Sequence, residues 1–233
     1  MSGSPPPELT IVVPAYNERE TIREILARVR ELPISKEVIV IDNCSTDGTR
    51  EILQGLPPTE GLTVVLQPSN YGKGTSVRTG FERARGEFVV CQDADLEYDP
   101  QDIPRLLEVA RGGADAVFGT RLSDQHSREG GNRFFSAGRR WVTTWFNLVF
   151  AARLTDVSTC YKMVRRAIIQ GIPLKGSGFE LDFEIPAKLR RAGVDIVEVP
   201  VSYAPRGFEQ GKKICWRDGF KAAWTILKYR FTR

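Results

Sequence analysis

Residues 88–99 read FVVCQDADLEYD, an apolar run that ends in the carboxylates Asp93 and Asp95, with Glu97 two positions further on. Carboxylates that gather where a buried strand meets solvent repel one another, so a bound cation best explains the arrangement. Oxygen ligands suit a hard divalent ion such as Mg²⁺ or Mn²⁺, which also binds substrate phosphates. Asp93, Asp95 and Glu97 are therefore predicted metal ligands.

The competing interpretation of this stretch is a solvated loop whose acids begin the next helix. Asp99 followed by Pro100 fits that role, as the N-cap and the first turn of a helix. Asp93 and Asp95 lie too far upstream to cap the same helix, which favours the metal site for them.

Outward from this stretch, short β-branched runs alternate with helical patterns along the chain. Strands are predicted over residues 9–13, 37–41, 62–66, 88–91 and 116–119. Helical spacing occupies residues 18–31, 46–55, 73–85 and 100–111. Such alternation builds a mostly parallel, Rossmann-like sheet flanked by helices, so the predicted fold class is α/β.

Polar clusters follow the first, second and fourth predicted strands, at residues 14–18, 42–48 and 93–97. In parallel sheets, ligands bind beyond the carboxyl ends of the strands. The three clusters are therefore expected to form one site.

The pattern changes after residue 120. An arginine-rich polar stretch over 121–140 leads into a predicted helix over 141–152 and a loop over 154–161. A helix over 180–192 and an alternating strand over 194–203 follow. We expect residues 1–7 to be a disordered tail and residues 8–233 to form one domain. Its predicted halves are a nucleotide-binding half (8–120) and an acceptor half (121–233).

The composition of the 233 residues, 41% hydrophobic and 27% charged, is that of an ordinary soluble domain. No apolar run approaches the roughly 20 residues that span a bilayer, and the N-terminus lacks the apolar region of a secretory signal. The four cysteines form no C-x-x-C pair, which argues against a zinc site or a disulfide framework. A cytoplasmic protein without transmembrane helices is expected.

Positive charge concentrates at the C-terminal end of the chain. The whole chain carries +4, whereas residues 206–233 contain eight Lys or Arg and two acids, a net charge of +6. A local excess of this kind indicates an anionic partner. Motifs for RNA recognition are not found, so nucleic acid is not the expected partner.

Eight short motifs occur together in one order. They are residues 12–18 (VVPAYNE), 40–49 (VIDNCSTDGT), 70–74 (NYGKG), 93–97 (DADLE), 119–121 (GTR), 159–163 (TCYKM), 198–200 (EVP), and Arg206 with 211–213 (GKK). In these motifs the chain resembles the family 2 glycosyltransferases of the GT-A type, in particular the transferases that act on polyprenyl or dolichyl phosphate and move mannose or glucose. The resemblance covers nearly the whole chain.

The resemblance implies a nucleotide-sugar donor. The residues that it assigns to the nucleotide are Pro14, Ala15, Tyr16, Glu18, Asp42, Lys73, Asp93 and Ala94. The chemistry agrees, because the carboxylate of Asp42 can accept a hydrogen bond from the imino N–H of uracil or of guanine, and Tyr16 can stack on the base. Mg²⁺ or Mn²⁺ at Asp93, Asp95 and Glu97 would bridge the donor diphosphate.

Basic residues in the second half match family positions that contact phosphates. The residues implied are Arg121, Arg139 or Arg140, Arg206, and Lys212 or Lys213. A guanidinium group suits this role because it can donate two parallel hydrogen bonds to two oxygens of one phosphate. Of these basic residues, Arg121, Arg206 and Lys212 join Asp95 as the predicted catalytic residues.

The type of acceptor decides whether the reaction needs a general base. A polyprenyl phosphate is already anionic, so it needs positioning and charge neutralisation and no strong base. A hydroxyl acceptor on a glycan or glycolipid would need a general base, and Asp182 in the acidic segment 179–184 is the candidate. Asp182 also fits the acidic first turn of a helix. The resemblance implies inversion at C1 on either route, and a non-catalytic nucleotide-sugar binding module is the third alternative.

Two segments combine aromatic and basic residues and are predicted amphipathic helices. The first covers residues 141–152, and the second lies in the basic segment after residue 215. Such helices bind anionic membrane surfaces. They can instead pack against the catalytic domain. Peripheral contact with the cytoplasmic face of a membrane is the favoured prediction for the second helix.

Overall fold

One mixed β-sheet organises the computed structural model, which describes residues 6–121, 133–205 and 216–232. Within these residues the sheet has seven strands in the order β3-β2-β1-β4-β6-β5-β7. The strands are β1 (Leu9–Ala15), β2 (Lys36–Asp42), β3 (Leu62–Leu66), β4 (Phe88–Cys91), β5 (Ala116–Thr120), β6 (Lys162–Arg165) and β7 (Ile196–Pro200). Neighbouring strands are parallel, except that β6 runs antiparallel to β4 and to β5. The predicted α/β class is confirmed.

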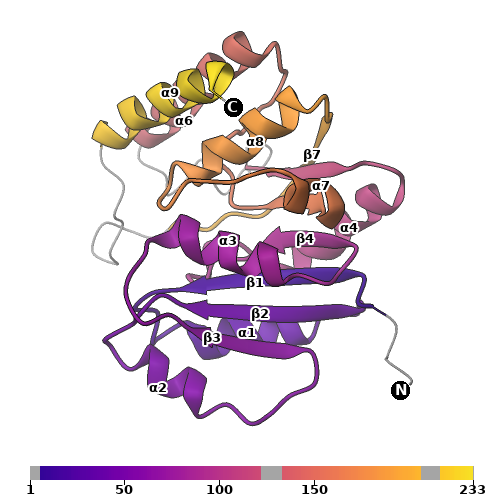
Figure 1. Cartoon of the computed structure of the whole chain (residues 1–233), viewed down its shortest axis with the longest axis vertical. Helices are drawn as coiled ribbons and strands as arrows, with labels where there is room; N and C mark the ends of the chain where they lie inside the picture. The colour runs from indigo at the N-terminus through magenta and orange to yellow at the C-terminus, as the bar shows by residue number, and fades with distance from the viewer. Residues whose placement is uncertain (1–5, 122–132, 206–215, 233) are drawn as a thin grey trace.

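Helices connect the strands and cover the sheet (Figure 1). They are α1 (Ile22–Arg30), α2 (Thr49–Gln54), α3 (Lys73–Arg83), the 3₁₀ turn η1 (Pro100–Asp102), α4 (Ile103–Arg111), α6 (Arg133–Phe150), α7 (Arg166–Gly171), α8 (Leu181–Arg191) and α9 (Trp216–Phe231). No helix in the described ranges is long and apolar enough to cross a membrane.

The central strands are apolar because both of their faces are covered. Ile11, Val12 and Val13 of β1 are fully buried, as expected for a parallel strand between two helical layers. Helix α3 lies directly on β1, since a Cβ atom at Gly80 would collide with the side chain of Val12. This glycine brings the start of α3 close to the carboxyl end of the sheet.

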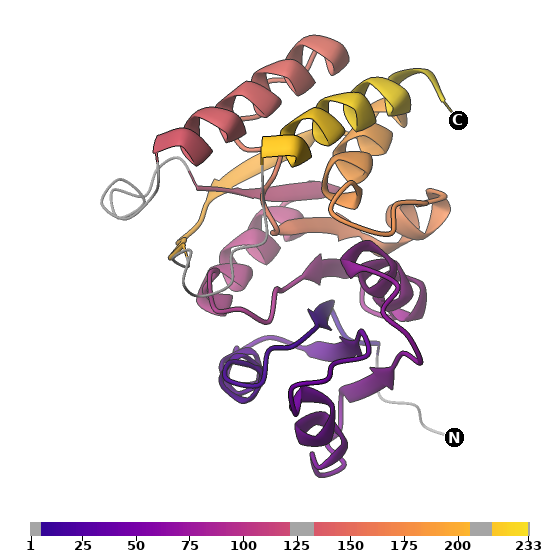
Figure 2. The same cartoon turned by 90° about the vertical axis from the view of Figure 1, so that its left-hand side faces the viewer.

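A second, smaller core lies between α6, α8 and α9. Its buried members are Val142, Phe146, Phe150, Leu154, Val157, Ala187, Ala222, Ile226 and Tyr229. Helices α6 and α9 lie side by side in both views (Figures 1 and 2), and the indole N–H of Trp145 donates to the carbonyl of Ala223 at 3.2 Å. The inner faces of both helices are therefore packed against the protein.

Two elements were not predicted, and one helix begins earlier than expected. Strand β6 has only four residues with a charge at each end, and β4 and β5 on either side hold it in place. The second unpredicted element is α7, the short helix that directly follows β6. Helix α6 begins at Arg133, inside the stretch that was predicted to be a polar connection, because arginine is a good helix former.

The carboxyl ends of β1, β2 and β4 meet at one edge of the sheet, as predicted. Ala15 at the end of β1 pairs with Asp42 at the end of β2, and the backbone N–H of Gln92 donates to Val12 at 2.9 Å. Each loop that follows contains a non-glycine residue in the left-handed region: Asn17, Cys44 or Leu96. Such strained residues concentrate at functional sites.

Candidate functional site

The loop after β4 holds the three predicted metal ligands, each partly exposed. The Asp95 carboxylate accepts a hydrogen bond from the backbone N–H of Glu97 at 3.1 Å. Glu97 accepts one from the hydroxyl of Tyr203 at 2.9 Å. Ala94, which the sequence assigned to the nucleotide, is buried between the two aspartates. Three carboxylates in one five-residue loop offer oxygen donors of the kind that Mg²⁺ or Mn²⁺ prefers, although they are not among the described groups whose ligand atoms all lie within 4.8 Å of one another.

A second group near this loop could hold a metal, and its ligands are softer. The ligand atoms of Cys91, Asp93 and Cys160 lie within 4.8 Å of one another. The Cys160 thiol lies 3.6 Å from the carbonyl oxygen of Cys91, and its contact with Cys91 and its burial raise its pKa well above the usual value. A protonated thiol is a poor ligand for a hard cation, so this group is a poor match for Mg²⁺ or Mn²⁺.

Lys73, the first residue of α3, forms an ion pair with Asp93. Its ammonium lies 2.8 Å from one Asp93 oxygen and 2.9 Å from the other. Burial opposes the charge of Lys73, but Asp93 and Asp182 keep its pKa well above the usual value. Burial likewise opposes ionisation of Asp93, and Lys73 keeps the pKa of Asp93 below its usual value. Both groups are therefore charged near neutral pH.

The glycines beside Lys73 are explained by a neighbouring loop. Gly72 has a left-handed φ of 87° as the N-cap of α3. A Cβ atom at Gly72 or Gly74 would collide with carbonyl oxygens of residues 176–178. These glycines therefore allow the loop 175–178 to lie against the first turn of α3.

Asp42, the predicted base-recognition residue, is fully buried at the end of β2. Its carboxylate accepts from Arg50 Nε at 2.6 Å and from the backbone N–H of Ser45 at 3.2 Å. Arg50 also donates to the carbonyl of Gln67. Arg50 lies in α2, within the predicted helical stretch 46–55, but no motif marked it as a partner of Asp42. Asp42 thus organises the loop after β2 by these contacts.

Four more predicted nucleotide residues lie at the end of β1 and in the loop that follows it. Pro14 and Ala15 end that strand, and Tyr16 is partly exposed just beyond it. The carboxylate of Glu18 accepts from the hydroxyl of Thr21 at 3.0 Å. Because Asn43 donates its backbone N–H to the carbonyl of Ala15 at 2.9 Å, the loops after β1 and β2 are joined.

Arg121 lies at the carboxyl end of β5 in a buried, bidentate ion pair that the sequence did not predict. Its Nε and one Nη lie 2.5 and 2.7 Å from the two oxygens of Asp156, and the same Nη lies 2.9 Å from the Ser158 hydroxyl. Burial opposes ionisation of Asp156, yet Arg121 lowers its pKa below the usual value. Asp156 lies in an irregular loop, so no periodicity marked it.

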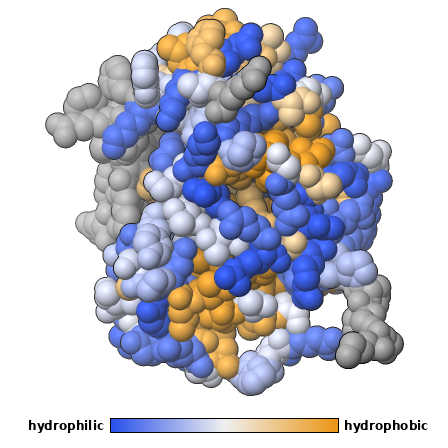
Figure 3. Space-filling view, viewed as in Figure 1, coloured by the Kyte–Doolittle hydropathy of each residue, from blue (hydrophilic) through white to orange (hydrophobic). Residues whose placement is uncertain are grey.

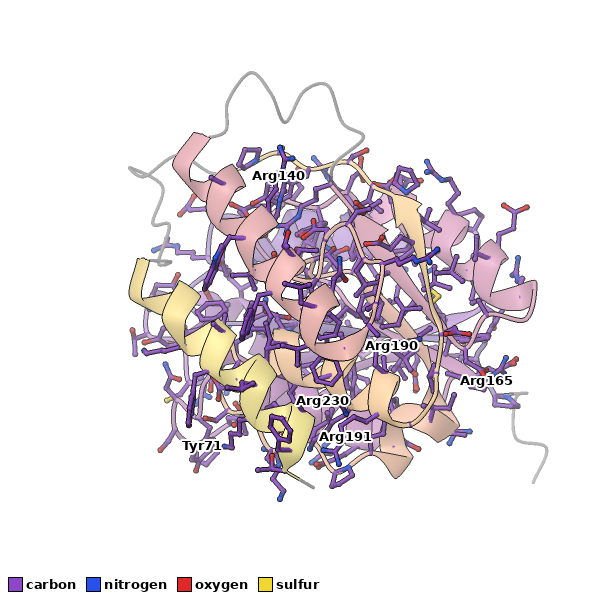
Figure 4. All side chains as sticks on the ribbon, turned by 90° about the horizontal axis from the view of Figure 1, so that it is seen from above. Tyr71, Arg140, Arg165, Arg190, Arg191 and Arg230 are labelled. Carbon is purple, nitrogen blue, oxygen red and sulfur yellow. The ribbon has the colours of Figure 1, made fainter. Side chains whose placement is uncertain are left out.

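A second guanidinium, that of Arg139 on α6, approaches the same carboxylate. Its Nη1 lies 3.9 Å from Asp156 Oδ2, and burial together with Arg121 lowers the pKa of Arg139. Its buried Nε has no hydrogen-bond partner among the described residues. Arg140, next in the chain, is exposed (Figure 4). Of the two candidates, Arg139 is therefore the one beside Arg121, and two guanidiniums share one carboxylate.

Tyr203 joins the carboxylate loop to this guanidinium pair, and sequence analysis missed it. Its hydroxyl donates to Glu97, while its ring centroid lies 4.9 Å from the Arg121 guanidinium carbon. The Tyr98 ring lies 5.1 Å from the Tyr203 ring. The only signal in the sequence was the position of Tyr203 at the end of the alternating stretch 194–203.

Asp182 lies in the first turn of α8, at a small cavity beside Lys73. One carboxylate oxygen lies 3.4 Å from the buried ammonium of Lys162. The cavity is lined by Lys73, Cys91, Cys160, Lys162 and Asp182 with apolar neighbours. Asp182 therefore adjoins the donor side of the site. Arg206, Lys212 and Lys213, predicted to contact phosphates, lie outside the described residues.

The chain is similar to known proteins in sequence and in fold. A family model described as "Glycosyl transferase family 2" matches residues 10–172. The undecaprenyl-phosphate 4-deoxy-4-formamido-L-arabinose transferase of Pseudomonas fluorescens is 32% identical over 191 residues, covering 73% of this chain and 53% of that protein. The dolichol-phosphate mannosyltransferase of Pyrococcus furiosus is 28% identical over 210 residues, covering 88% of this chain and 59% of that protein. The chain thus spans little more than half the length of these relatives.

Solved structures show the same fold. Glucosyl-3-phosphoglycerate synthase from Mycobacterium tuberculosis, crystallised with uridine diphosphate, superposes with a TM-score of 0.74 over 97% of this chain and 81% of that one. The sequence identity is 19%, so the likeness concerns the fold alone. Another crystal of that synthase holds Mn²⁺, uridine diphosphate and glucosyl-3-phosphoglycerate. The fold and the family model agree, and the chain belongs to glycosyl transferase family 2.

Proposed function

We propose that the chain is an inverting, metal-dependent glycosyltransferase that moves a hexose from GDP-mannose or UDP-glucose to a polyprenyl phosphate at the cytoplasmic face of a membrane. The family supplies the reaction class, and the two relatives are named for undecaprenyl phosphate and dolichol phosphate. The observation that carries the proposal is the contact of Tyr203 with both the carboxylate loop and Arg121. The proposed cation site at the carboxylate loop and the proposed phosphate site at Arg121 therefore lie next to each other.

The donor occupies the half made of residues 8–120. Asp93, Asp95 and Glu97 would hold Mg²⁺ or Mn²⁺, which when bound neutralises charge on a leaving diphosphate. Lys73 adds a fixed positive charge beside them. The loops that contain Tyr16, Glu18 and Asp42 would contact the nucleoside.

The acceptor phosphate occupies the half made of residues 121–233. Arg121 and Arg139 place two positive charges beside the single charge of Asp156, and the Nε of Arg139, which has no hydrogen-bond partner among the described residues, offers a donor. Buried guanidiniums bind phosphate oxygens strongly. By resemblance, Arg206, Lys212 and Lys213 contribute to the same phosphates.

The transfer then needs no general base. An oxygen of the acceptor phosphate attacks C1 of the sugar, the new C1–O bond forms on the opposite face, and the bond to the nucleoside diphosphate breaks. The leaving diphosphate takes the electron pair, and no proton moves. The chain's own contribution is to align the two phosphates and balance their charge.

A transfer assay with purified protein tests the proposal. We expect a glycosyl polyprenyl phosphate to form from GDP-mannose or UDP-glucose, undecaprenyl phosphate and Mn²⁺. Asp95→Ala should reduce the rate at least about a hundredfold, because it removes a metal ligand. Full activity in excess chelator would contradict the metal assignment.

A hydroxyl acceptor is the second candidate, because Asp182 adjoins the donor side at the Lys73 cavity. If Asp182 were the general base, Asp182→Asn should lower kcat by about a hundredfold or more. We expect a much milder loss, since Asp182 is engaged by Lys162 and a phosphate needs no base. Measuring kcat with undecaprenyl phosphate and with a glycolipid alcohol separates the two acceptors.

Peripheral membrane contact is the last part of the proposal. Of the seven exposed large apolar side chains among the residues whose burial is described, four lie on α6 and α9, namely Trp141, Leu148, Trp224 and Phe231. Apolar residues gather at the top of the molecule over these helices (Figure 3), and Lys228 and Arg230 of α9 add positive charge. A lipid phosphate reached from the membrane surface suits such a face.

A further inference from the structure

Glu184 of α8 is a fully buried carboxylate that the proposed reaction does not use. Its two oxygens accept the backbone N–H groups of Lys175 at 2.8 Å and Gly176 at 2.6 Å. The ammonium of Lys188 lies 2.6 Å from the first of these oxygens. Burying a charge in this way is costly unless its hydrogen bonds are made, so Glu184 fixes residues 175 and 176 of the loop 175–178, while Glu180 accepts the backbone N–H groups of Ser177 at 2.8 Å and Gly178 at 2.9 Å.

The loop that Glu184 holds lies on the first turn of α3. The carbonyl of Ser177 accepts the backbone N–H of Thr75 at 3.2 Å, and the carbonyl of Lys175 accepts from Arg78 at 3.1 Å. Gly72 and Gly74 leave just the room that this contact needs. A shift of the loop would therefore shift the start of α3.

The start of α3 carries Lys73, which is paired with Asp93 in the carboxylate loop. The loop 175–178 thus lies between a buried carboxylate and the donor side of the site. On its other side, Lys188, the ion-pair partner of Glu184, lies 5.0 Å from the centroid of the Tyr229 ring, and burial and Glu184 raise the pKa of Tyr229. Tyr229 belongs to α9, the helix proposed to face the membrane.

We infer that Glu184 is a positioning residue for donor binding: it holds the start of the loop 175–178 against α3 and so places Lys73 against Asp93, and Tyr229 of α9 packs on Lys188, the ion-pair partner of Glu184. This inference rests on the proposed function for the identity of the donor. The inferred effect of Glu184 on the position of α3 does not depend on the proposed function.

The first test measures amide hydrogen exchange by mass spectrometry, without ligand. Glu184→Gln keeps the size of the side chain but replaces one acceptor oxygen by an amide. We expect exchange in peptides from residues 72–79 and 175–179 to accelerate about tenfold, with α1 unchanged. The matched control is Glu37→Gln, another buried carboxylate that accepts a backbone N–H, from Arg85. Unchanged exchange over 72–79 in Glu184→Gln would overturn the inference.

The second test measures the affinity for uridine diphosphate and guanosine diphosphate, each with Mn²⁺, by calorimetry. Glu184→Gln should weaken binding about tenfold, as expected when a residue that orients ligand-contacting groups is replaced. Tyr229→Phe should weaken it by about threefold or less, because it removes only the hydroxyl and keeps the ring beside Lys188. Glu37→Gln should leave affinity unchanged even if it lowers the melting temperature.

A double-mutant cycle with Lys73→Ala then separates positioning from general loosening. If Glu184 acts through Lys73, Glu184→Gln should cost little further affinity when Lys73 is absent. Fully additive losses would overturn the inference. If the wild-type chain binds neither nucleotide, the proposed function fails, while the exchange measurement still decides whether Glu184 places α3.

Discussion

Three buried charges meet at Asp156, whose carboxylate is fully enclosed between two guanidiniums. Removing one partner of such a pair leaves an uncompensated charge in the interior. Asp156→Asn should therefore lower the free energy of unfolding by about 3 kcal/mol. Urea unfolding at pH 7 measures the loss. As a control, Glu8→Gln breaks the bidentate pair with Arg111, which is exposed, and should change stability far less.

The same residue gives a pH dependence with a definite sign. The folded-state pKa of Asp156 lies below its unfolded value, which is about 3.9. Its contribution to stability is thus complete above the unfolded pKa and is lost as the pH falls through the folded one. The difference between wild type and Asp156→Asn should be constant from pH 7 to 5 and shrink below about pH 4. A difference that grows on acidification would contradict the assignment.

At the scale of elements, α6 and α9 present different inner and outer faces. Ile226 is fully buried, whereas Leu148 and Trp224 are 74% and 68% exposed. The double variant Leu148→Ser, Trp224→Ser should keep its melting temperature but bind phosphatidylglycerol vesicles at least about tenfold more weakly, because two large apolar side chains no longer enter the interface.

A vesicle sedimentation assay measures this binding, and Val197→Ser is its control. Val197 is also exposed and apolar, but it lies on the edge strand β7. Equal vesicle binding by the double variant and the wild type would contradict membrane contact through these helices. Loss of binding in Val197→Ser alone would place the contact elsewhere.

Elements whose pattern is local could be predicted from the sequence. The strand 88–91 and the carboxylates after it lie within ten residues, so their pattern is readable in one window. The Arg121 pair was not predicted, because its partner Asp156 lies 35 residues away in an irregular loop. Strand β6 was missed for a related reason: its four residues acquire strand geometry from neighbours that are distant in sequence.

The residues of the candidate site divide in the same way: some belong to local sequence motifs, and others depend on partners that are distant in sequence. The carboxylate loop and Lys73 followed from motifs, whereas Tyr203 acts through a contact 106 residues away with Glu97. Asp42 was expected to face the nucleotide, and the ion pair with Arg50 depends on how α2 folds back on β2. Motifs thus led to the predicted site residues, whereas the partners of those residues depend on the fold.

At the scale of the whole molecule, β6 ties the two halves of the chain into one sheet. It comes from residues 162–165, yet it lies between β4 and β5 of the first half. A fragment of residues 1–121 would therefore leave β4 and β5 with unpaired edges, which favour aggregation. We expect this fragment to show no cooperative thermal transition by circular dichroism, in contrast to the full chain. A cooperative, monomeric fragment would contradict this expectation.

Because β6 lies between β4 and β5, the sheet cannot be completed until the ribosome has made residues 162–165. The chain must grow by about 74 residues after Cys91 before Arg165 is made, which takes on the order of 4 to 15 seconds at ordinary elongation rates. During that time β1, β2 and β3 can already pair, while β4 keeps one edge open. Factors that shield nascent chains should matter most for this protein in that interval, and slow codons between residues 91 and 165 would lengthen it.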